Sequence, residues 1–201
     1  MIKQLNLVLA GVGGQGTLVA GKLLGLVAGR LGLDVKVSEV HGMSQRGGSV
    51  VTYVRMGSRV FSPIVEAGTA DIILAFEELE ALRWAPLLRE GGVLLINTTR
   101  TIPLTVAMGQ AQYPENILEQ LRQAAGDKAV IEAFDGARLA REAGSARAVN
   151  MVMIGAMSRY LDLPAELFLT AIDQVFAEKL RPANHKAFQA GSAIIESKNP
   201  A

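Results

Sequence analysis

The chain of 201 residues contains no cysteine. Disulfide bonds, zinc sites built on thiolates and thiol catalysis are therefore excluded, and the chain cannot hold an iron–sulfur cluster through thiolates of its own. This absence fits a reducing compartment. The N-terminus also lacks a basic stretch followed by a cleavable apolar segment, so we expect a cytoplasmic protein.

Aromatic residues are scarce, at 5%, and the 20 lysines and arginines are balanced by 19 aspartates and glutamates. Without a large charge of one sign, we expect neither a nucleic-acid nor a membrane partner. The longest apolar stretch is interrupted by Lys22 and by glycines, which argues against a membrane-spanning helix. What remains is a chain with 50% hydrophobic residues, long enough for one α/β domain with a full core.

A glycine-rich turn near the N-terminus has a clear chemical signature. Residues 5–10 are apolar and predict a strand buried on both faces. Gly11, Gly13 and Gly16 follow at G-x-G-x-x-G spacing. Gly14 and Gln15 complete the turn. Such glycines allow a tight turn, close approach of the backbone to a ligand, and close packing of helix on strand.

A helix is expected directly after this turn. Its buried face is predicted to carry Leu18, Leu23, Leu24 and Val27. Strand, turn and helix together form the first half of a Rossmann-like βαβ unit. The start of the helix presents N–H groups and the positive end of the helix dipole, which suit a phosphate. The alternative is a turn that needs small residues only for packing.

Hydrophobic patterns predict further strands and helices along the chain. Expected strands span residues 34–40, 49–56, 59–62 (a short antiparallel return), 70–76, 93–97 and 128–134. Expected helices span 77–89, ended by Gly91 and Gly92, then 114–125, 136–143, 147–161, 164–179 and 183–197. Residues 98–112 show no regular pattern. The order predicts one domain over residues 1–201: a three-layer, open, mostly parallel sheet with helices on both faces and a small antiparallel hairpin.

A second glycine-bearing loop, residues 41–49, follows the second expected strand. It contains Ser44, Gln45, Arg46, Gly47 and Gly48. An arginine beside two glycines places a cation next to bare backbone, which suits a phosphate or carboxylate. The loop follows the carboxyl end of a strand, where open α/β sheets bind ligands. Alternatively, the arginine only pairs with a neighbouring carboxylate.

Other kinds of site are weaker candidates. Glu39 lies where a dinucleotide-binding fold places a ribose-binding acid, but a loop and a strand follow instead of a plain helix. Glu39 and His41 could both contact a metal, yet two ligands do not make a site. His185 is the other histidine, and we expect structural roles for both. No nucleophile or carboxylate pair indicates a catalytic residue.

Several stretches taken together resemble one known family. They are GVGGQG at 11–16, SEVHGMSQRGGSVV at 38–51, LAFE at 74–77, EALR at 80–83 and NHKAFQAG at 184–191. They resemble the γ-type module of the 2-oxoacid:ferredoxin oxidoreductases, and most closely the indolepyruvate-specific β subunits. The likeness covers almost the whole chain. It departs from the family pattern at residues 181–185, which are marked by a proline and a histidine.

The resemblance implies a division of labour between two subunits. A larger α subunit binds thiamine diphosphate and 4Fe-4S clusters, decarboxylates an aryl 2-oxoacid and reduces ferredoxin, while coenzyme A takes the acyl group. This chain, with no metal or catalytic residue of its own, helps form the cleft for coenzyme A or substrate and the subunit interface. We expect the turn at 11–16 and the loop at 41–49 to meet there. The alternatives are a free-standing NAD(P)-dependent oxidoreductase and an assembly scaffold.

Overall fold

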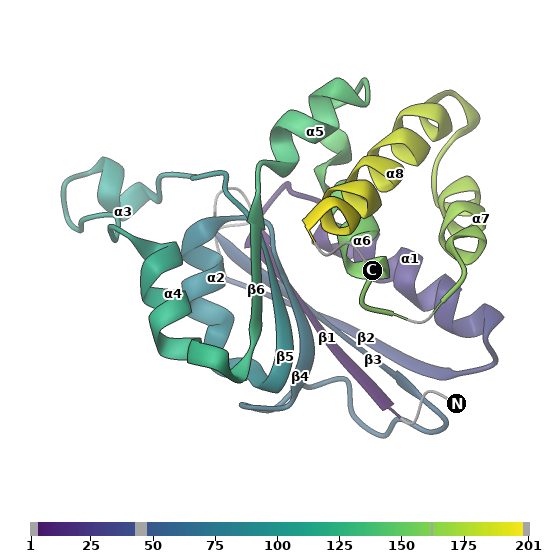
Figure 1. Cartoon of the computed structure of the whole chain (residues 1–201), viewed down its shortest axis with the longest axis horizontal. Coiled ribbons are helices and arrows are strands. Elements are labelled where there is room, and N and C mark those ends of the chain that lie inside the picture. The colour runs from purple at the N-terminus through teal and green to yellow at the C-terminus, as the bar shows by residue number, and fades with distance from the viewer. Residues whose placement is uncertain (1–3, 43–47, 162, 199–201) are drawn as a thin grey trace.

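Six strands form one sheet in the order β2-β3-β1-β4-β5-β6. The computed structural model describes residues 4–42, 48–161 and 163–198 (Figure 1). The strands are β1 (Gln4–Val12), β2 (Asp34–His41), β3 (Ser49–Gly57), β4 (Ala70–Ala75), β5 (Leu88–Asn97) and β6 (Val130–Phe134). Strands β1, β4, β5 and β6 are parallel, and β3 is antiparallel to both β1 and β2. The open, mostly parallel sheet is therefore confirmed.

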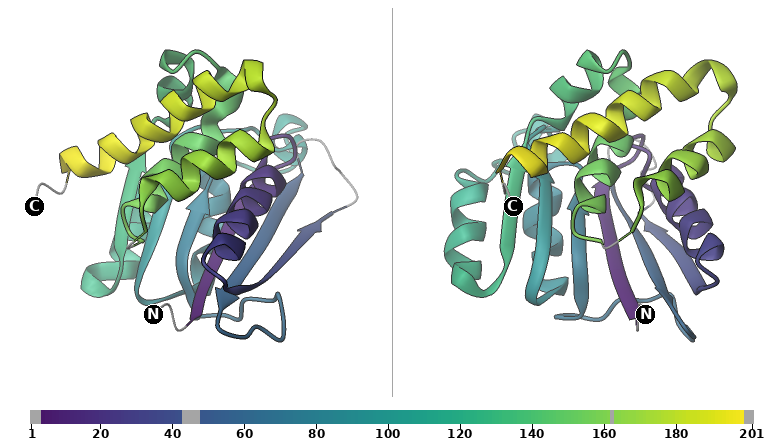
Figure 2. Two further views of the ribbon diagram at one scale, coloured as in Figure 1. Left: turned by 90° about the vertical axis from the view of Figure 1, so that its right-hand side faces the viewer. Right: turned by 45° about the vertical axis from the view of Figure 1, so that its right-hand side comes forward.

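Helices cover both faces of this sheet. They are α1 (Thr17–Arg30), α2 (Glu78–Trp84), α3 (Leu104–Ala107), α4 (Ile117–Ala125), α5 (Gly136–Glu142), α6 (Val149–Ser158), α7 (Ala165–Val175) and α8 (Arg181–Lys198). Helices α1 and α5 to α8 pack on one face, and α2 and α4 pack on the other. Figure 2 shows α1 in dark purple beside α7 in yellow-green, with α8 in yellow on the same face. The three predicted layers are present.

The apolar run of β1 is buried on both faces, as expected for a central strand. Leu7 and Leu9 pack with α1 on one face, and Val8 packs under α2 and α4 on the other. The prediction that Leu18 lies on the buried face of α1 is wrong, because its side chain is 54% exposed. At 100° per residue it lies about 140° around the helix from Leu23, outside the buried stripe.

Helices α6 and α8 cross at backbone contact. A Cβ atom added to Gly155 would lie 1.9 Å from the carbonyl oxygen of Phe188. One added to Gly191 would lie 1.9 Å from the carbonyl oxygen of Val152. Phe188 also stacks on Phe168 of α7, with ring centroids 5.5 Å apart. The two glycines therefore set the spacing of the helical layer.

Two predicted elements are wrong. Residues 59–62 form no strand, because both sides of β3 are already paired, with β1 and β2. The antiparallel hairpin is instead formed by β2 and β3. Gly91 and Gly92 do not end a helix: α2 stops at Trp84, a 3-10 turn with Pro86 follows, and both glycines lie inside β5.

Candidate functional site

The predicted glycine turn joins β1 to α1 at the carboxyl edge of the sheet. Gly14 and Gly16 have φ values of +102° and +82°, in the left-handed region that favours glycine. Gln15 closes the turn from inside: its Oε1 accepts from the Val12 N–H at 2.8 Å, and its Nε2 donates to the Phe76 carbonyl at 3.3 Å. Gln15 therefore shapes the turn with both polar atoms of its side chain.

The glycines of the turn meet different surroundings. A Cβ on Gly11 would lie 2.7 Å from Gln15 Oε1 and 3.2 Å from the Phe76 Cβ. A Cβ on Gly16 would lie 2.7 Å from the amide nitrogen of Asn150, a buried residue of α6. A Cβ on Gly14 would have no heavy atom of the described residues within 4 Å. Packing thus explains Gly11 and Gly16, whereas Gly14 meets no neighbour in the described part of the chain.

The two glycine loops meet, as the sequence analysis expected. The Gly13 N–H donates to the Gly48 carbonyl at 2.9 Å, beside the pairing of Val12 with Ser49. Four of the predicted site residues lie outside the described part of the chain: Ser44, Gln45, Arg46 and Gly47. Their proposed role in binding stays a prediction.

A hollow of about 400 Å³ lies beside the turn. Its lining residues come from the turn, the first residues of α1, and strands β2 and β3: Gly13, Gly14, Gly16, Thr17, Leu18, Glu39, His41 and Val50. Among the described residues, no side chain caps the N-terminus of α1, and its first turn contains no acid. The positive end of the helix dipole therefore lies at the hollow, which is an arrangement that binds anions.

The hollow also has an acidic side. Glu39 accepts a long hydrogen bond of 3.4 Å from the Thr52 hydroxyl, and His41 Nδ1 lies 3.1 Å from the Gly42 carbonyl oxygen. No group of three or more potential metal ligands occurs among the described residues. A phosphate therefore suits the α1 side of the hollow, and a hydroxyl or amino group suits the Glu39 side.

The position of Glu39 departs from the dinucleotide-binding pattern. That pattern places the acidic residue on the strand next to β1. Here β3 lies between β1 and β2, so Glu39 is two strand spacings from β1, or about 10 Å. The insertion of β3 therefore disfavours the ribose-binding role for Glu39.

Sequence reasoning missed a cluster of buried carboxylates directly after β4. Glu77, Glu78 and Glu80 are 1%, 4% and 2% exposed. Glu80 Oε2 accepts from the Ser49 hydroxyl at 2.5 Å and from the Trp84 indole N–H at 3.1 Å, and Arg83 pairs with Oε1. Because Ser49 adjoins Gly48, Glu80 holds the end of the second glycine loop from the α2 side.

The other two carboxylates hold the chain that follows β5. Glu77 Oε1 accepts from the Tyr113 hydroxyl at 2.6 Å and from the Thr101 N–H at 3.0 Å. Glu78 pairs with Arg100 at 2.6 Å, which raises the pKa of Arg100. Burial, together with the bond to Glu77, raises the pKa of Tyr113 above its ordinary value of about 10. The sequence signal that could have revealed this cluster is the group of three glutamates, Glu77, Glu78 and Glu80, that follows a buried strand.

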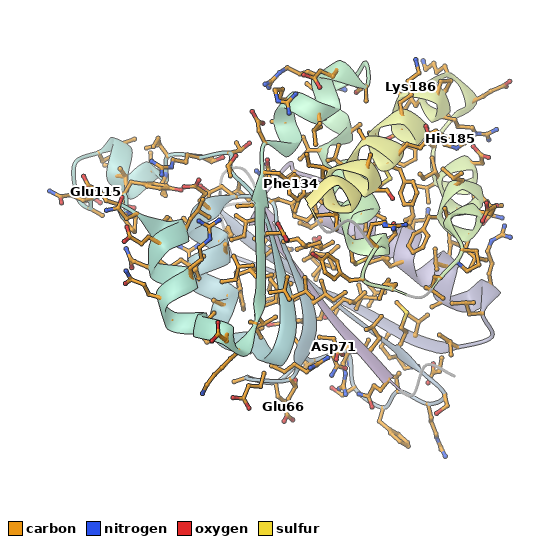
Figure 3. The ribbon with its side chains drawn as sticks, viewed as in Figure 1. Glu66, Asp71, Glu115, Phe134, His185 and Lys186 are labelled. Atoms are coloured by element: carbon orange, nitrogen blue, oxygen red, sulfur yellow. The ribbon has the colours of Figure 1, made fainter. Side chains whose placement is uncertain are left out.

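The second histidine lies in the helical layer, on α8. His185 Nε2 lies 2.9 Å from Asp173 Oδ1 and joins α8 to α7. Figure 3 shows His185 and Lys186 on this helical layer, at the opposite end of the molecule from Glu115. Residues 181–185, where a departure from the family pattern was expected, form the start of α8.

Comparison with known proteins gives a consistent result. The family model described as pyruvate ferredoxin/flavodoxin oxidoreductase matches residues 6–194. The indolepyruvate oxidoreductase subunit IorB of Pyrococcus horikoshii is 42% identical over 194 residues, covering 94% of this chain and 95% of that protein.

Solved structures share the fold. The γ subunit of a keto/oxoacid ferredoxin oxidoreductase from Geobacter sulfurreducens is 23% identical with a TM-score of 0.71, covering 96% of this chain and 99% of that one. A 2-oxoglutarate:ferredoxin oxidoreductase from Magnetococcus marinus, solved with 2-oxoglutarate, coenzyme A and succinyl-CoA, is 21% identical with a TM-score of 0.76. That match covers 99% of this chain and 32% of the other. With its family model matched over nearly its whole length, the chain belongs to the pyruvate ferredoxin/flavodoxin oxidoreductase family.

Proposed function

We propose that this chain is the small subunit of a 2-oxoacid:ferredoxin oxidoreductase whose substrate is indolepyruvate. The observation that supports it most is the 42% identity to an indolepyruvate oxidoreductase subunit over almost the full length of both chains. In this proposal the complete enzyme converts the aryl 2-oxoacid and coenzyme A to acyl-CoA and CO₂, with reduction of ferredoxin.

The cofactors belong to a larger partner subunit in this proposal. Thiamine diphosphate supplies the decarboxylation chemistry, and 4Fe-4S clusters carry the electrons to ferredoxin. The sequence supports this assignment, because it contains no cysteine that could ligate a cluster. The described residues also contain no group of three or more potential metal ligands. The small subunit then contributes binding and positioning in the cytoplasmic complex.

Coenzyme A is the ligand proposed for the hollow beside the glycine turn. Its phosphates suit the uncapped start of α1 and the open backbone at Gly14, with Arg46 as the predicted cation. Gly11, Gly13, Gln15 and Gly48 shape the same edge, and Ser44, Gln45 and Gly47 complete the proposed set. Glu39 would face an uncharged hydrogen-bond donor of the ligand.

Leu18 offers a sharp test, because it lines the hollow and is 54% exposed. Leu18→Glu adds a carboxylate to the first turn of α1, where it favours the helix dipole and therefore folding. The same charge repels a phosphate. In the complex with the larger subunit, we expect the KM for coenzyme A to rise roughly tenfold, or about 1.4 kcal/mol, while the kcat changes little. Leu18→Gln is the uncharged control.

The outcomes distinguish the alternatives. An unchanged KM for coenzyme A in a fully assembled Leu18→Glu enzyme would remove the hollow from coenzyme A binding. If Leu18→Glu prevents assembly with the larger subunit instead of changing turnover, the result would favour the alternative in which this chain is only an assembly scaffold. Micromolar binding of NAD(H) or NADP(H) by the isolated chain, measured by calorimetry, would favour the free-standing oxidoreductase.

A further inference from the structure

A stretch of 14 uncharged residues, Thr101 to Pro114, projects from the carboxyl edge of the sheet. We call it the 101–114 segment; Arg100 and Glu115 are the charged residues on either side of it. Figure 1 shows its helix, α3, standing away from the body beyond α4. Three large apolar side chains are exposed on it: Ile102 at 56%, Leu104 at 73% and Met108 at 61%.

The tip of the segment is a closed local structure. Helix α3 ends at Ala107, and Gly109, which follows the C-cap residue Met108, has a φ of +70°. The Gln110 N–H donates to the Thr105 carbonyl at 2.8 Å, and the Gly109 N–H donates to the Val106 carbonyl at 3.0 Å. This pair of bonds is the Schellman motif that terminates helices. The exposed leucine and methionine are therefore held on a defined turn.

The base of the segment is clamped by buried carboxylates. Glu77 binds both ends, through the Thr101 N–H and the Tyr113 hydroxyl. Arg100 pairs with Glu78 and lies 5.6 Å from the centre of the Tyr113 ring. Burying a carboxylate is costly unless it is fully hydrogen-bonded. Here the buried charge fixes the position of a segment whose own outer surface is apolar.

We propose that the 101–114 segment is a preformed docking element for the larger subunit of the oxidoreductase, an inference that rests on the proposed function. Exposed apolar side chains on a segment with no charged residue of its own resemble the core of a permanent subunit interface. The rigid base lowers the entropic cost of binding. The segment is at the same edge as the glycine turn, since it follows β5, so a subunit bound here can also reach the hollow.

One solved structure with this fold supports a permanent neighbour. In the Magnetococcus marinus enzyme, the region that matches this chain makes up 32% of one longer polypeptide. The same fold is there covalently joined to further protein. The partner surface expected here is apolar and uncharged, because the segment offers no charged side chain for an ion pair.

The test is co-purification of the larger subunit with tagged variants of this chain. Leu104→Asp combined with Met108→Asp places two charges on the docking surface, and we expect recovery of the larger subunit to fall about tenfold or more. Leu180→Asp is the matched control: this leucine is 47% exposed, on the 3-10 turn before α8. Circular dichroism and the melting temperature of each isolated variant check folding, which exposed substitutions should hardly alter.

Each outcome decides one question. If the wild-type chain recovers the larger subunit and the double variant recovers as much, the docking inference fails and the proposed function stands. Equal losses in the double variant and in Leu180→Asp also overturn it. If the wild-type chain recovers none, the proposed function fails as well. A dimer of the isolated wild-type chain that the double variant dissociates would identify a second copy as the occupant and overturn the inference.

Discussion

Gly14 and Gly16 share a left-handed backbone but differ in what surrounds them. An alanine in the left-handed region costs about 1–2 kcal/mol relative to glycine. At Gly14 the added Cβ meets no described atom within 4 Å, whereas at Gly16 it lies 2.7 Å from Asn150 Nδ2. We expect Gly16→Ala to lower the free energy of unfolding clearly more than Gly14→Ala, as measured by urea denaturation. Equal losses would show that Asn150 moves away freely.

Tyr113 gives a prediction about pH. Its pKa is raised by burial and by the hydrogen bond to Glu77, so the folded state favours the neutral phenol. The corresponding stability is fully present below about pH 10 and is lost as the pH rises through the folded pKa. Tyr113→Phe should cost about 1 kcal/mol at neutral pH and should flatten the loss of stability above pH 10.

Two measurements check this expectation. Urea denaturation at several alkaline pH values follows the stability, and absorbance near the tyrosinate band follows ionisation directly. In the difference between wild type and Tyr113→Phe, the tyrosinate signal should appear above the pH at which free tyrosine ionises. A difference spectrum that titrates like free tyrosine would contradict the clamp.

For individual residues, the sequence predicts that a glycine turn is present, but it does not predict which glycines are required by packing and which are not. The G-x-G-x-x-G spacing after an apolar run is a local pattern, and local patterns are readable. Which glycine packs and which faces open space depends on Asn150, which lies 134 residues from Gly16 along the chain. Glu77 and Glu80 were missed for the same reason, because their partners Tyr113 and Ser49 are distant in sequence.

Among the contacts between helices and strands, the crossing of α6 and α8 leaves the least room for a larger side chain. Gly191→Ala would drive a Cβ to 1.9 Å from the Val152 carbonyl oxygen, so the helices must separate. We expect a loss of at least ~3 kcal/mol in the free energy of unfolding, at the upper end of overpacking effects. Gly25→Ala in the middle of α1 is the control, since its nearest neighbour, Val37 Cγ2, is 3.9 Å away.

The control should change stability in the opposite direction. Alanine is better than glycine inside a helix by roughly 0.5–1 kcal/mol, so Gly25→Ala should stabilise the protein slightly. Thermal or urea unfolding of both variants tests the pair. Similar small effects at Gly25 and Gly191 would mean that α6 and α8 tolerate a wider spacing.

Strands were easier to predict than their boundaries. Buried runs such as residues 70–76 are visible because every residue except Asp71 is apolar. Gly91 and Gly92 misled the prediction because glycines end helices and also occur in irregular strands. Here the pairing of β4 with β5 shifts register between Ala70 and Ile72, and Gly91 has a φ of +72°.

For the whole molecule, the sheet is shared by two cores, one on each face. Trp84 is the single tryptophan and lies on the α2 side, where its ring meets Tyr53 edge-on at 6.4 Å. Phe168 is fully buried in the core on the opposite face. Phe168→Ala should lower stability by ~3–5 kcal/mol, and Trp84 fluorescence should report the loss because both cores depend on the same strands.

The measurement is urea denaturation followed by fluorescence and by far-UV circular dichroism. The two transitions should coincide and shift together in the variant. A Trp84 transition that stays at its wild-type midpoint, while circular dichroism shifts, would show that the two layers unfold independently.

The architecture was predictable at this scale, but the strand order was not. Alternating strands and helices indicate a mostly parallel sheet with helices on both faces. The insertion of β3 between β1 and β2 is set by pairing across the sheet, which the hydrophobic pattern of a buried strand does not specify. The meeting of the two glycine loops was predictable, because both follow strands that end at the same edge.

The last helix has a consequence for synthesis of the protein. Ile195 of α8 packs in the same core as Leu7 of β1, so the core on the α1 side of the sheet is incomplete until translation has passed α8. A nascent chain still on the ribosome therefore exposes part of an apolar core, which invites aggregation and calls for chaperones. The helical layer can close only once the chain has been released far enough for α8 to reach α6.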